Sequence, residues 1–301
     1  MSIESLQAFS DQLADVVAKI SLSTVRVEAR SRVAAAGIVW SQEGIILTAD
    51  HVVEREENIR VDLQGESHQA ELVGRDPTSD LAVLRIKAGQ VVPATIAGLG
   101  NLRVGNMVVA VARPWGEPIA SIGYVAALGR RGLEQEWGEQ FREGLIHADL
   151  TLYPGFSGGP LADLTGQVVG VNTSGPGQRM RVAIPAETAA RVASELLKEG
   201  RIKRGYLGIG VQKIPLAPAM ADKLGIAQET GLMVLTVEPG SGAEAAGILP
   251  GDIVVALDDQ PIARVRELHA WLSQARSGRQ VQARLIRGGE IKQIPVTIGE
   301  R

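Results

Sequence analysis

Three polar residues in distinctive local sequences constrain the fold of this chain more than any other feature. Ser157 lies in the run Gly-Phe-Ser-Gly-Gly-Pro-Leu at residues 155–161, and His51 and Asp80 each lie beside an apolar run far upstream. A histidine, an aspartate and a serine in this chain order match one convergent version of the catalytic triad. If the three act together, the fold must bring distant segments to one place.

The residue types fit one kind of chemistry. A serine hydroxyl is a weak nucleophile near neutral pH, and a neighbouring imidazole can take its proton and later return it to the leaving group. We therefore expect Ser157 to be the nucleophile, His51 the general base and acid, and Asp80 the carboxylate that fixes the histidine tautomer. The backbone N–H groups of Gly155 and Ser157 are expected to form an oxyanion hole, since glycine tolerates the tight turn that would aim them.

Each of these residues also has an ordinary interpretation. Ser157 could be a turn residue in a glycine-rich loop, and Asp76 competes with Asp80 for the carboxylate role. Asp80 is preferred because it directly precedes the run Leu-Ala-Val-Leu. The serine run also satisfies the G-x-S-x-G pattern of α/β-hydrolases. That interpretation is disfavoured because Gly-Gly-Pro is a poor helix start and because the acid and the histidine precede the serine.

The pattern of apolar runs indicates a mainly β fold. Short β-type runs separated by Gly and Pro turns extend from Val25 to Val182, which fits a pair of antiparallel β-barrels with a cleft between them. The clearest runs are residues 45–47, 81–86, 108–112, 168–171 and 182–184. A helix is predicted over residues 185–200, with Gly200 as its C-cap. An amphipathic helix is predicted at the start of the chain, from the spacing of Leu6, Phe9, Leu13, Val16, Val17 and Ile20.

Length and composition limit the class of protein. A chain of 301 residues indicates two domains, and 35 glycines fit turn-rich β structure. The net charge of −3 gives no reason to expect nucleic-acid binding. Cysteine is absent and the four histidines form no close ligand pair, so neither a metal nor another cofactor is expected. No membrane span or secretory leader is recognised, which indicates a cytoplasmic chain or a mature form restarted at a methionine.

Three segments together resemble the HtrA (Deg) family of serine proteases. They are Ile-Leu-Thr-Ala-Asp-His-Val-Val at 46–53, Asp-Pro-Thr-Ser-Asp-Leu-Ala-Val-Leu at 76–84, and Pro-Gly-Phe-Ser-Gly-Gly-Pro-Leu at 154–161, followed by Gly-Gln-Val-Val-Gly-Val-Asn-Thr at 166–173. The resemblance extends from about Ser10 to the C-terminus. It departs at Phe156, where the family usually has asparagine, and at residues 112–116, where Ala-Arg-Pro-Trp-Gly stands for Gly-Asn-Pro-Phe-Gly.

The C-terminal part resembles a PDZ domain. Residues 238–254 carry its core pattern, in which a short helix leads through a glycine turn and Gly-Asp into a strand. A four-residue run resembles the loop that holds a peptide's terminal carboxylate beside a pairing strand: Tyr206, Leu207, Gly208 and Ile209. Leu268 and Leu272 are spaced to wall the groove, although core residues would look the same. The predicted boundaries are 1–22 for an N-terminal helical segment, 23–200 for a trypsin-like protease domain and 201–301 for the PDZ domain.

The family resemblance carries further implications. It implies a chymotrypsin-like double β-barrel followed by an α+β PDZ domain. It also implies an ATP-independent serine endopeptidase that acts on unfolded or damaged proteins, in protein quality control and stress response, and whose PDZ domain binds C-terminal peptides. Family members often lie in the periplasm or cell envelope and form homotrimers, so the N-terminal apolar stripe would pack on its own domain or on a neighbouring subunit. By family alignment, the substrate pocket is formed by Leu152, Val171, Asn172 and Thr173.

A second hypothesis comes from another class of function. The departures at Phe156 and at residues 112–116 also fit a chaperone or peptide-binding adaptor whose protease site is largely silent. Digestion of an unfolded protein such as casein would separate the two hypotheses.

Overall fold

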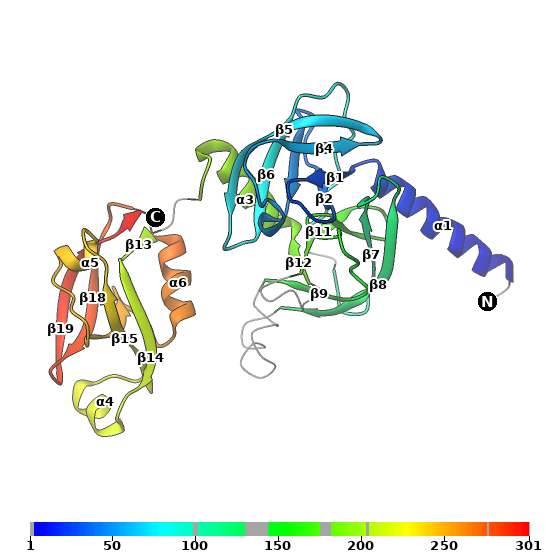
Figure 1. The fold of residues 1–301 in the computed structure, drawn as a ribbon. Helices are drawn as coiled ribbons and strands as arrows, with labels where there is room; N and C mark the ends of the chain where they lie inside the picture. Colours follow the sequence, from blue (N-terminus) through cyan, green and yellow to red (C-terminus); the bar gives the residue numbers. More distant parts are fainter. Residues whose placement is uncertain are drawn as a thin grey trace. The chain divides into compact units, whose positions relative to one another are not determined.

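The chain folds into two compact units, Met1–Ile202 and Lys203–Arg301 (Figure 1). The computed structural model describes residues 3–98, 102–129, 144–174, 182–202, 205–275 and 277–300, with the backbone alone described at 266, 273 and 274. Residues 203 and 204, just after the predicted boundary at residue 200, lie outside the described residues. The predicted domain boundaries remain predictions, and the N-terminal helix belongs to the first unit.

The first unit contains two closed six-stranded antiparallel barrels, as the β-type runs predict. The first barrel has the order β1-β2-β3-β6-β5-β4 and is built from β1 (Thr24–Glu28), β2 (Ala35–Val39), β3 (Ile45–Thr48), β4 (Ile59–Leu63), β5 (Glu66–Asp76) and β6 (Leu81–Ile86). The second has the order β10-β11-β12-β9-β8-β7 and is built from β7 (Met107–Ala112), β8 (Ile119–Leu128), β9 (Ile146–Asp149), β10 (Pro160–Asp163), β11 (Val168–Thr173) and β12 (Val182–Pro185). Closure leaves neither barrel with a free sheet edge.

The barrel interiors explain why these runs form strands. Most positions of β2, β3, β6, β7 and β11 are fully buried, which matches their continuous apolar sequences. The first barrel encloses a core that includes Val25, Ile46 and Leu84. The second encloses a separate core that includes Val108 and Leu161. Two independent cores in one unit place a junction between the barrels, where both can supply side chains to one site.

Helix α3 (Ala186–Glu199) lies within the predicted range and covers strands of both barrels. Its buried residues recur at helical spacing and pack with Ile38, Val83 and Val171. The helix ends at Gly200, which has a φ of +71° and donates its N–H to the carbonyl of Leu196 at 2.9 Å. Glycine adopts this left-handed conformation at little cost, so the local sequence fixes the end of the helix.

Helix α1 (Ile3–Ser21) packs on the barrels through its C-terminal end only. Ile20 is buried with Val109, Val111 and Ala162 of the second barrel. The Lys19 ammonium donates to the carbonyl of Thr165 at 2.7 Å. The first ten residues of the helix are exposed, so Leu6 and Phe9 of the predicted apolar stripe are uncovered, whereas the last three members pack on the second barrel: Val16, Val17 and Ile20.

The second unit has the mixed α/β composition expected of a PDZ domain. Its main sheet runs β14-β15-β16-β18-β19, from β14 (Ile209–Pro215), β15 (Thr230–Val237), β16 (Ile253–Leu257), β18 (Gln280–Arg287) and β19 (Glu290–Thr297), with β17 (Gln260–Pro261) paired to β16. A small sheet joins β13 (Gly205–Tyr206) to β20 (Gly299–Glu300). The helices are α4 (Pro218–Leu224), α5 (Gly242–Ala245) and α6 (Val265–Gln274). Among the described residues, no helix is long and apolar enough to cross a membrane.

The packing of α3 gives a direct test of the first unit. Leu196 is completely buried, whereas its neighbour Leu197 is 37% exposed. Leu196→Ala should lower the free energy of unfolding by about 2–5 kcal/mol, because it removes transfer energy and leaves a cavity. Leu197→Ala is the matched control and should lower it by less than about 1 kcal/mol. Urea denaturation followed by circular dichroism measures both, and equal losses would contradict this packing.

Candidate active site

His51 lies on a single 3₁₀ turn, η1 (Asp50–Val52), which follows β3 directly. The turn closes through the N–H of Val53, which donates to the carbonyl of Asp50 at 2.9 Å. Just before it, the buried Thr48 hydroxyl donates to the carbonyl of Ala36 at 2.7 Å. His51 therefore lies on a short, hydrogen-bonded turn at the end of β3 in the first barrel.

Asp80 lies on the turn between β5 and β6 and faces His51. Its carboxylate accepts from Nδ1 of His51 at 2.8 and 2.9 Å and from the His51 backbone N–H at 2.9 Å. It also accepts a hydrogen bond from the hydroxyl of Thr173. The φ of Asp80 is +57°, a left-handed conformation that aspartate tolerates better than most residues.

The competing carboxylate, Asp76, has a different place. It is buried and accepts from the backbone N–H groups of Thr78 and Ser79, each at 3.2 Å. Aspartate commonly forms such a turn with residues two and three positions on. Asp76 thus shapes the turn that presents Asp80.

The electrostatics of Asp80 follow from its partners. Burial acts to raise the pKa of the carboxyl, but the hydrogen bonds from His51 and Thr173 outweigh it, and the pKa of Asp80 lies below its usual value. The group is therefore ionised at neutral pH. An ionised carboxylate on Nδ1 holds that proton on the imidazole and leaves Nε2 as the acceptor.

The Ser157 turn is held between the two barrels. The carbonyl of Ser157 accepts from the N–H of Ala36 on β2 at 3.1 Å, and the N–H of Gly158 donates to Asn172 on β11 at 2.8 Å. A Cβ at Gly158 would lie 2.2 Å from Oγ1 of Thr48, so only glycine fits there. This packing places the serine turn against the strand end that leads to His51.

The two expected oxyanion donors point to no acceptor within the described chain. Neither the Gly155 nor the Ser157 N–H donates a hydrogen bond there, although Phe156 between them donates to the carbonyl of Tyr153 at 3.2 Å. Gly155 has a φ of +97° and packs on Pro114. A Cβ added to Gly155 would lie only 2.6 Å from Cβ of Pro114. The unpaired N–H groups of Gly155 and Ser157, on one turn with the serine hydroxyl, suit the binding of a developing oxyanion.

Phe156 points into the protein. Its side chain is fully buried in the core of the second barrel, with its ring centroid 5.8 Å from that of Tyr153. The side chain that departs from the family pattern is thus part of the core, and the neighbouring N–H groups stay free of it.

No hydrogen bond joins Ser157 Oγ to His51 among the described residues. Nε2 of His51 lies 3.5 Å from the hydroxyl of Ser174. Catalytic hydrogen bonds are often long in ligand-free sites and tighten with substrate. The structure therefore brings His51, Asp80 and Thr173 into direct contact and places Ser157 on an adjoining turn.

The predicted pocket residues have different environments. Leu152 is half-buried against the second barrel, and Val171 is fully buried beneath α3. The Asn172 amide donates to the carbonyl of Pro160 at 2.7 Å, which ties β11 to β10. Thr173 donates to Asp80, a contact that the sequence analysis did not anticipate. The sequence signal that could have indicated this contact is the position of Thr173, a hydroxyl residue at the end of a buried apolar strand.

The predicted carboxylate loop of the second unit lies before the edge strand β14. Gly208 has a φ of +82°, and the Leu207 and Gly208 N–H groups donate no hydrogen bond within the described chain. Their carbonyls accept from Ala243 and Glu238, which fixes the loop. Tyr206 on β13 and Ile209 on β14 flank the loop and are partly exposed.

The two predicted groove leucines on α6 differ in exposure. Leu268 is buried in the core of the unit, together with Leu207 of the loop. Leu272 is only partly buried against the same core. Leu272, like Ile209, therefore keeps surface that a bound peptide could contact.

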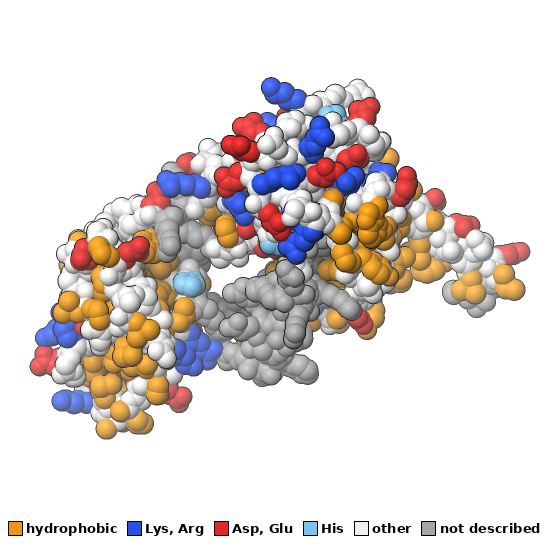
Figure 2. Space-filling view, viewed as in Figure 1, with side chains coloured by type: hydrophobic (Ala, Val, Ile, Leu, Met, Phe, Trp, Pro, Cys, Tyr) orange, Lys and Arg blue, Asp and Glu red, His pale blue; other side chains and the backbone are white. Residues whose placement is uncertain are grey.

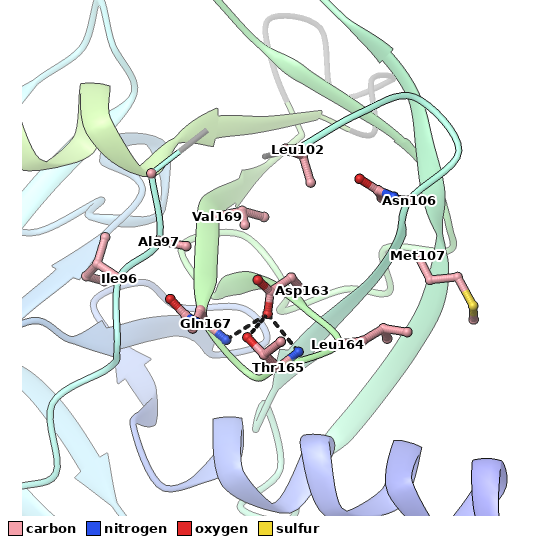
Figure 3. Close-up of a pocket in the computed structure, with 11 residues that line it drawn as sticks. Ile96, Ala97, Leu102, Asn106, Met107, Asp163, Leu164, Thr165, Gln167 and Val169 are labelled. Atoms are coloured by element: carbon pink, nitrogen blue, oxygen red, sulfur yellow. Dashed lines mark hydrogen bonds between the residues drawn. The ribbon is translucent and has the colours of Figure 1, made fainter. Parts of the chain in front are cut away.

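A cavity of about 430 Å³ lies elsewhere on the second barrel (Figure 3). Its walls mix apolar side chains with polar ones, and Asp163 there accepts from Thr165 and from the backbone of Gln167. None of the predicted site residues lines it. Within the described parts of the chain, no cluster of His, Cys, Asp and Glu could hold a metal ion.

Comparison with known families matches both units. The profile of a trypsin-like peptidase domain matches residues 35–171, and that of a PDZ domain matches residues 205–298. A probable periplasmic serine endoprotease, DegP-like, from Chlamydia trachomatis is 35% identical over 280 residues, which are 91% of this chain and 55% of that protein. The periplasmic pH-dependent serine endoprotease DegQ of Escherichia coli is 35% identical over 269 residues, 87% of this chain and 58% of that protein. The chain thus spans just over half the length of these curated relatives.

Solved structures of similar proteins agree with the fold. An HtrA-type protease, AlgW, with a decapeptide has a TM-score of 0.78 at 26% identity, covering 96% of this chain and 98% of that one. A serine endoprotease from Yersinia pestis has a TM-score of 0.77 at 28% identity, with the same coverage of both chains.

The hydrogen bond from Thr173 predicts how Asp80 titrates. Thr173→Val removes the donor at nearly constant volume, so the pKa of Asp80 should rise towards about 3.9. Thr173→Ser keeps a hydroxyl and should leave it low. NMR titration of the carboxyl carbon measures both variants, and an unchanged value in Thr173→Val would contradict the contact.

The same shift has a consequence for stability. A lowered folded-state pKa stabilises the fold above the unfolded value of about 3.9 and loses that contribution as the pH falls through the folded value. Thr173→Val should therefore be less stable than wild type at neutral pH, and the gap should narrow below about pH 4. Chemical denaturation across this range measures it.

Proposed function

This chain belongs to the HtrA/Deg family of trypsin-like serine proteases with a PDZ domain, and from that membership we propose that it is an ATP-independent serine endopeptidase. The observation that supports the activity is the His51–Asp80 hydrogen-bonded pair beside a serine turn with two unpaired N–H groups. Unfolded or damaged proteins are the proposed substrates. The curated relatives are named as periplasmic, and we propose the same compartment for this chain.

The proposed mechanism assigns one role to each group. Ser157 Oγ attacks the peptide carbonyl while Nε2 of His51 takes its proton and then delivers it to the leaving amine. Asp80 orients the imidazole through Nδ1 and stabilises the imidazolium that forms. The Gly155 and Ser157 N–H groups bind the oxyanion, and water then releases the acyl group by the same steps in reverse.

The silent-site adaptor is the alternative function. It was motivated by Phe156 and by residues 112–116. Phe156 packs inside the barrel, and the loop residue Pro114 supports Gly155 through van der Waals contact. Both observations favour a working peptidase over the adaptor.

Loss of the nucleophile or the base should abolish hydrolysis. Ser157→Ala and His51→Ala should each lower kcat by about 10⁶, because the triad acts as a unit. Asp80→Asn should lower it by about 10⁴ through the wrong histidine tautomer. Casein digestion and labelling by a fluorophosphonate probe measure these effects, with Ser67→Ala, an exposed serine on β5, as the control that should match wild type. Wild-type labelling of the Ser157→Ala protein would exclude Ser157 as the nucleophile.

We propose that the second unit binds the C-termini of peptides. The unpaired N–H groups of Leu207 and Gly208 would hold the terminal carboxylate, and the peptide would add to the sheet at β14. Ile209 and Leu272 would contact the last side chain, which we expect to be apolar because neither residue is charged. Leu268, although buried, would support the wall from behind.

Amidation of the peptide tests the carboxylate site. An amide end should weaken binding by about 1.5–3 kcal/mol relative to the free acid, the usual contribution of hydrogen bonds to a charged group. Calorimetry on the full chain carrying Ser157→Ala, which cannot cleave the peptide, compares the two. Equal affinities would show that the loop does not read the terminus.

We propose that the chain assembles as a homotrimer through its N-terminal part. Leu6 and Phe9 on α1 are 50% and 40% exposed, which leaves a helical apolar face uncovered. Figure 2 shows further hydrophobic side chains on the barrel surface from which this helix extends. Trimer formation in the family supports covering this face with neighbouring subunits.

A charge in the exposed stripe should weaken assembly. Phe9→Asp would bury a carboxylate at the proposed interface and should shift the mass measured by light scattering towards the monomer. Ala8→Asp adds the same charge to the exposed part of the helix but away from the stripe, so this matched control should leave the mass unchanged. A monodisperse wild-type monomer at micromolar concentration would reject the trimer.

A further inference from the structure

The end of strand β5 lies behind both His51 and Asp80. Its last residue, Asp76, forms the turn that carries Asp80. The residue before it, Arg75, reaches in the other direction, to the 3₁₀ turn that carries His51. Two consecutive residues of β5 thus support the two turns that carry His51 and Asp80.

Arg75 binds the histidine turn at two points. Its Nε donates to Oδ1 of Asp50 at 2.5 Å, and its Nη2 lies 3.4 Å from the Asp50 carbonyl. That carbonyl is also the acceptor that closes the turn with Val53. The guanidinium therefore fixes the side chain and the backbone of the residue that directly precedes His51.

The pair is partly shielded from water. The Asp50 side chain is 10% exposed and that of Arg75 is 32% exposed, while Glu56 flanks the outer side of the guanidinium at 3.7 Å. Removing one member of a buried ion pair leaves an uncompensated charge, which the structure relieves by moving towards water. For Asp50, such movement would displace the turn that carries His51.

We propose that Arg75 and Asp50 form a positioning pair that sets the distance and angle between His51 and Asp80. Neither residue touches the reacting atoms. This inference rests on the proposed peptidase function, since it concerns the base of the same site. A small displacement of a base costs rate more than binding, so the pair should affect kcat and leave KM nearly unchanged.

The kinetic test compares three variants of the full chain. Arg75→Gln should lower kcat on a peptide substrate by about 10- to 100-fold with KM within about twofold of wild type. Arg75→Lys keeps the charge but not the two-point contact, so it should recover only part of the rate. Arg191→Gln removes an exposed ion pair on α3, with Glu195 at 3.3 Å, and should match wild type.

A spectroscopic test reads the geometry without turnover. The Nδ1 proton of a histidine bonded to a carboxylate gives a far-downfield NMR resonance. The wild type, Arg75→Lys and Arg191→Gln should show it, and Arg75→Gln should lose or broaden it. A double variant, Asp50→Asn with Arg75→Gln, should lose no more rate than Arg75→Gln alone, because the two residues act through one contact.

The outcomes separate this inference from the proposed function. If the wild type hydrolyses peptides and Arg75→Gln keeps both its kcat and its resonance, the positioning pair is overturned and the peptidase stands. If the wild type is inactive, the proposed peptidase function is rejected, and the NMR resonance alone tests whether Arg75 and Asp50 position His51. If Arg75→Gln does not fold, Asp50→Asn replaces it in both tests, and a wild-type result there overturns the pair.

Discussion

The junction between the two barrels is the constraint on which the site depends. Asp80 comes from the first barrel but takes a hydrogen bond from Thr173 of the second. The Ser157 turn comes from the second barrel but accepts from Ala36 of the first. Each barrel closes around its own core, so the junction is made of two rigid bodies in one unit. A site built across rigid elements keeps its geometry without relying on long loops.

Two carboxylates at this junction lie near His51, and each has its own partners. Asp80 is ionised because donors outweigh the effect of its burial. Asp50, one residue before His51, is a second carboxylate near the imidazole, and its charge is compensated by Arg75. Buried charges are tolerated when they are paired and hydrogen-bonded. The imidazole thus lies near one carboxylate that bonds it directly and another that is already engaged.

Much of this arrangement could be predicted from the sequence because it follows from local patterns. The apolar runs predict the barrel strands, and Gly200 predicts the end of α3, because strand burial and left-handed caps have strong residue preferences. The contact between His51 and Asp80 follows from motif order. The contact of Arg75 with Asp50, 25 positions apart, has no local signal, and the orientation of Phe156 depends on a cavity that only the closed barrel creates.

Phe156, which directly precedes the proposed nucleophile Ser157, is a member of the core of the second barrel. Its ring packs in the same cluster as Val108 and Leu161, while its backbone separates the two N–H groups of the turn. A substitution that repacks this core could therefore shift the backbone of Phe156 and, with it, the adjoining Ser157, although no site residue is changed. In laboratory evolution for heat resistance, a cavity-filling substitution near Phe156 that raises the melting temperature would be kept only if it leaves the Ser157 turn able to perform its proposed acylation. The effect of one such substitution would therefore depend on the others, and compatible substitutions should occur in pairs.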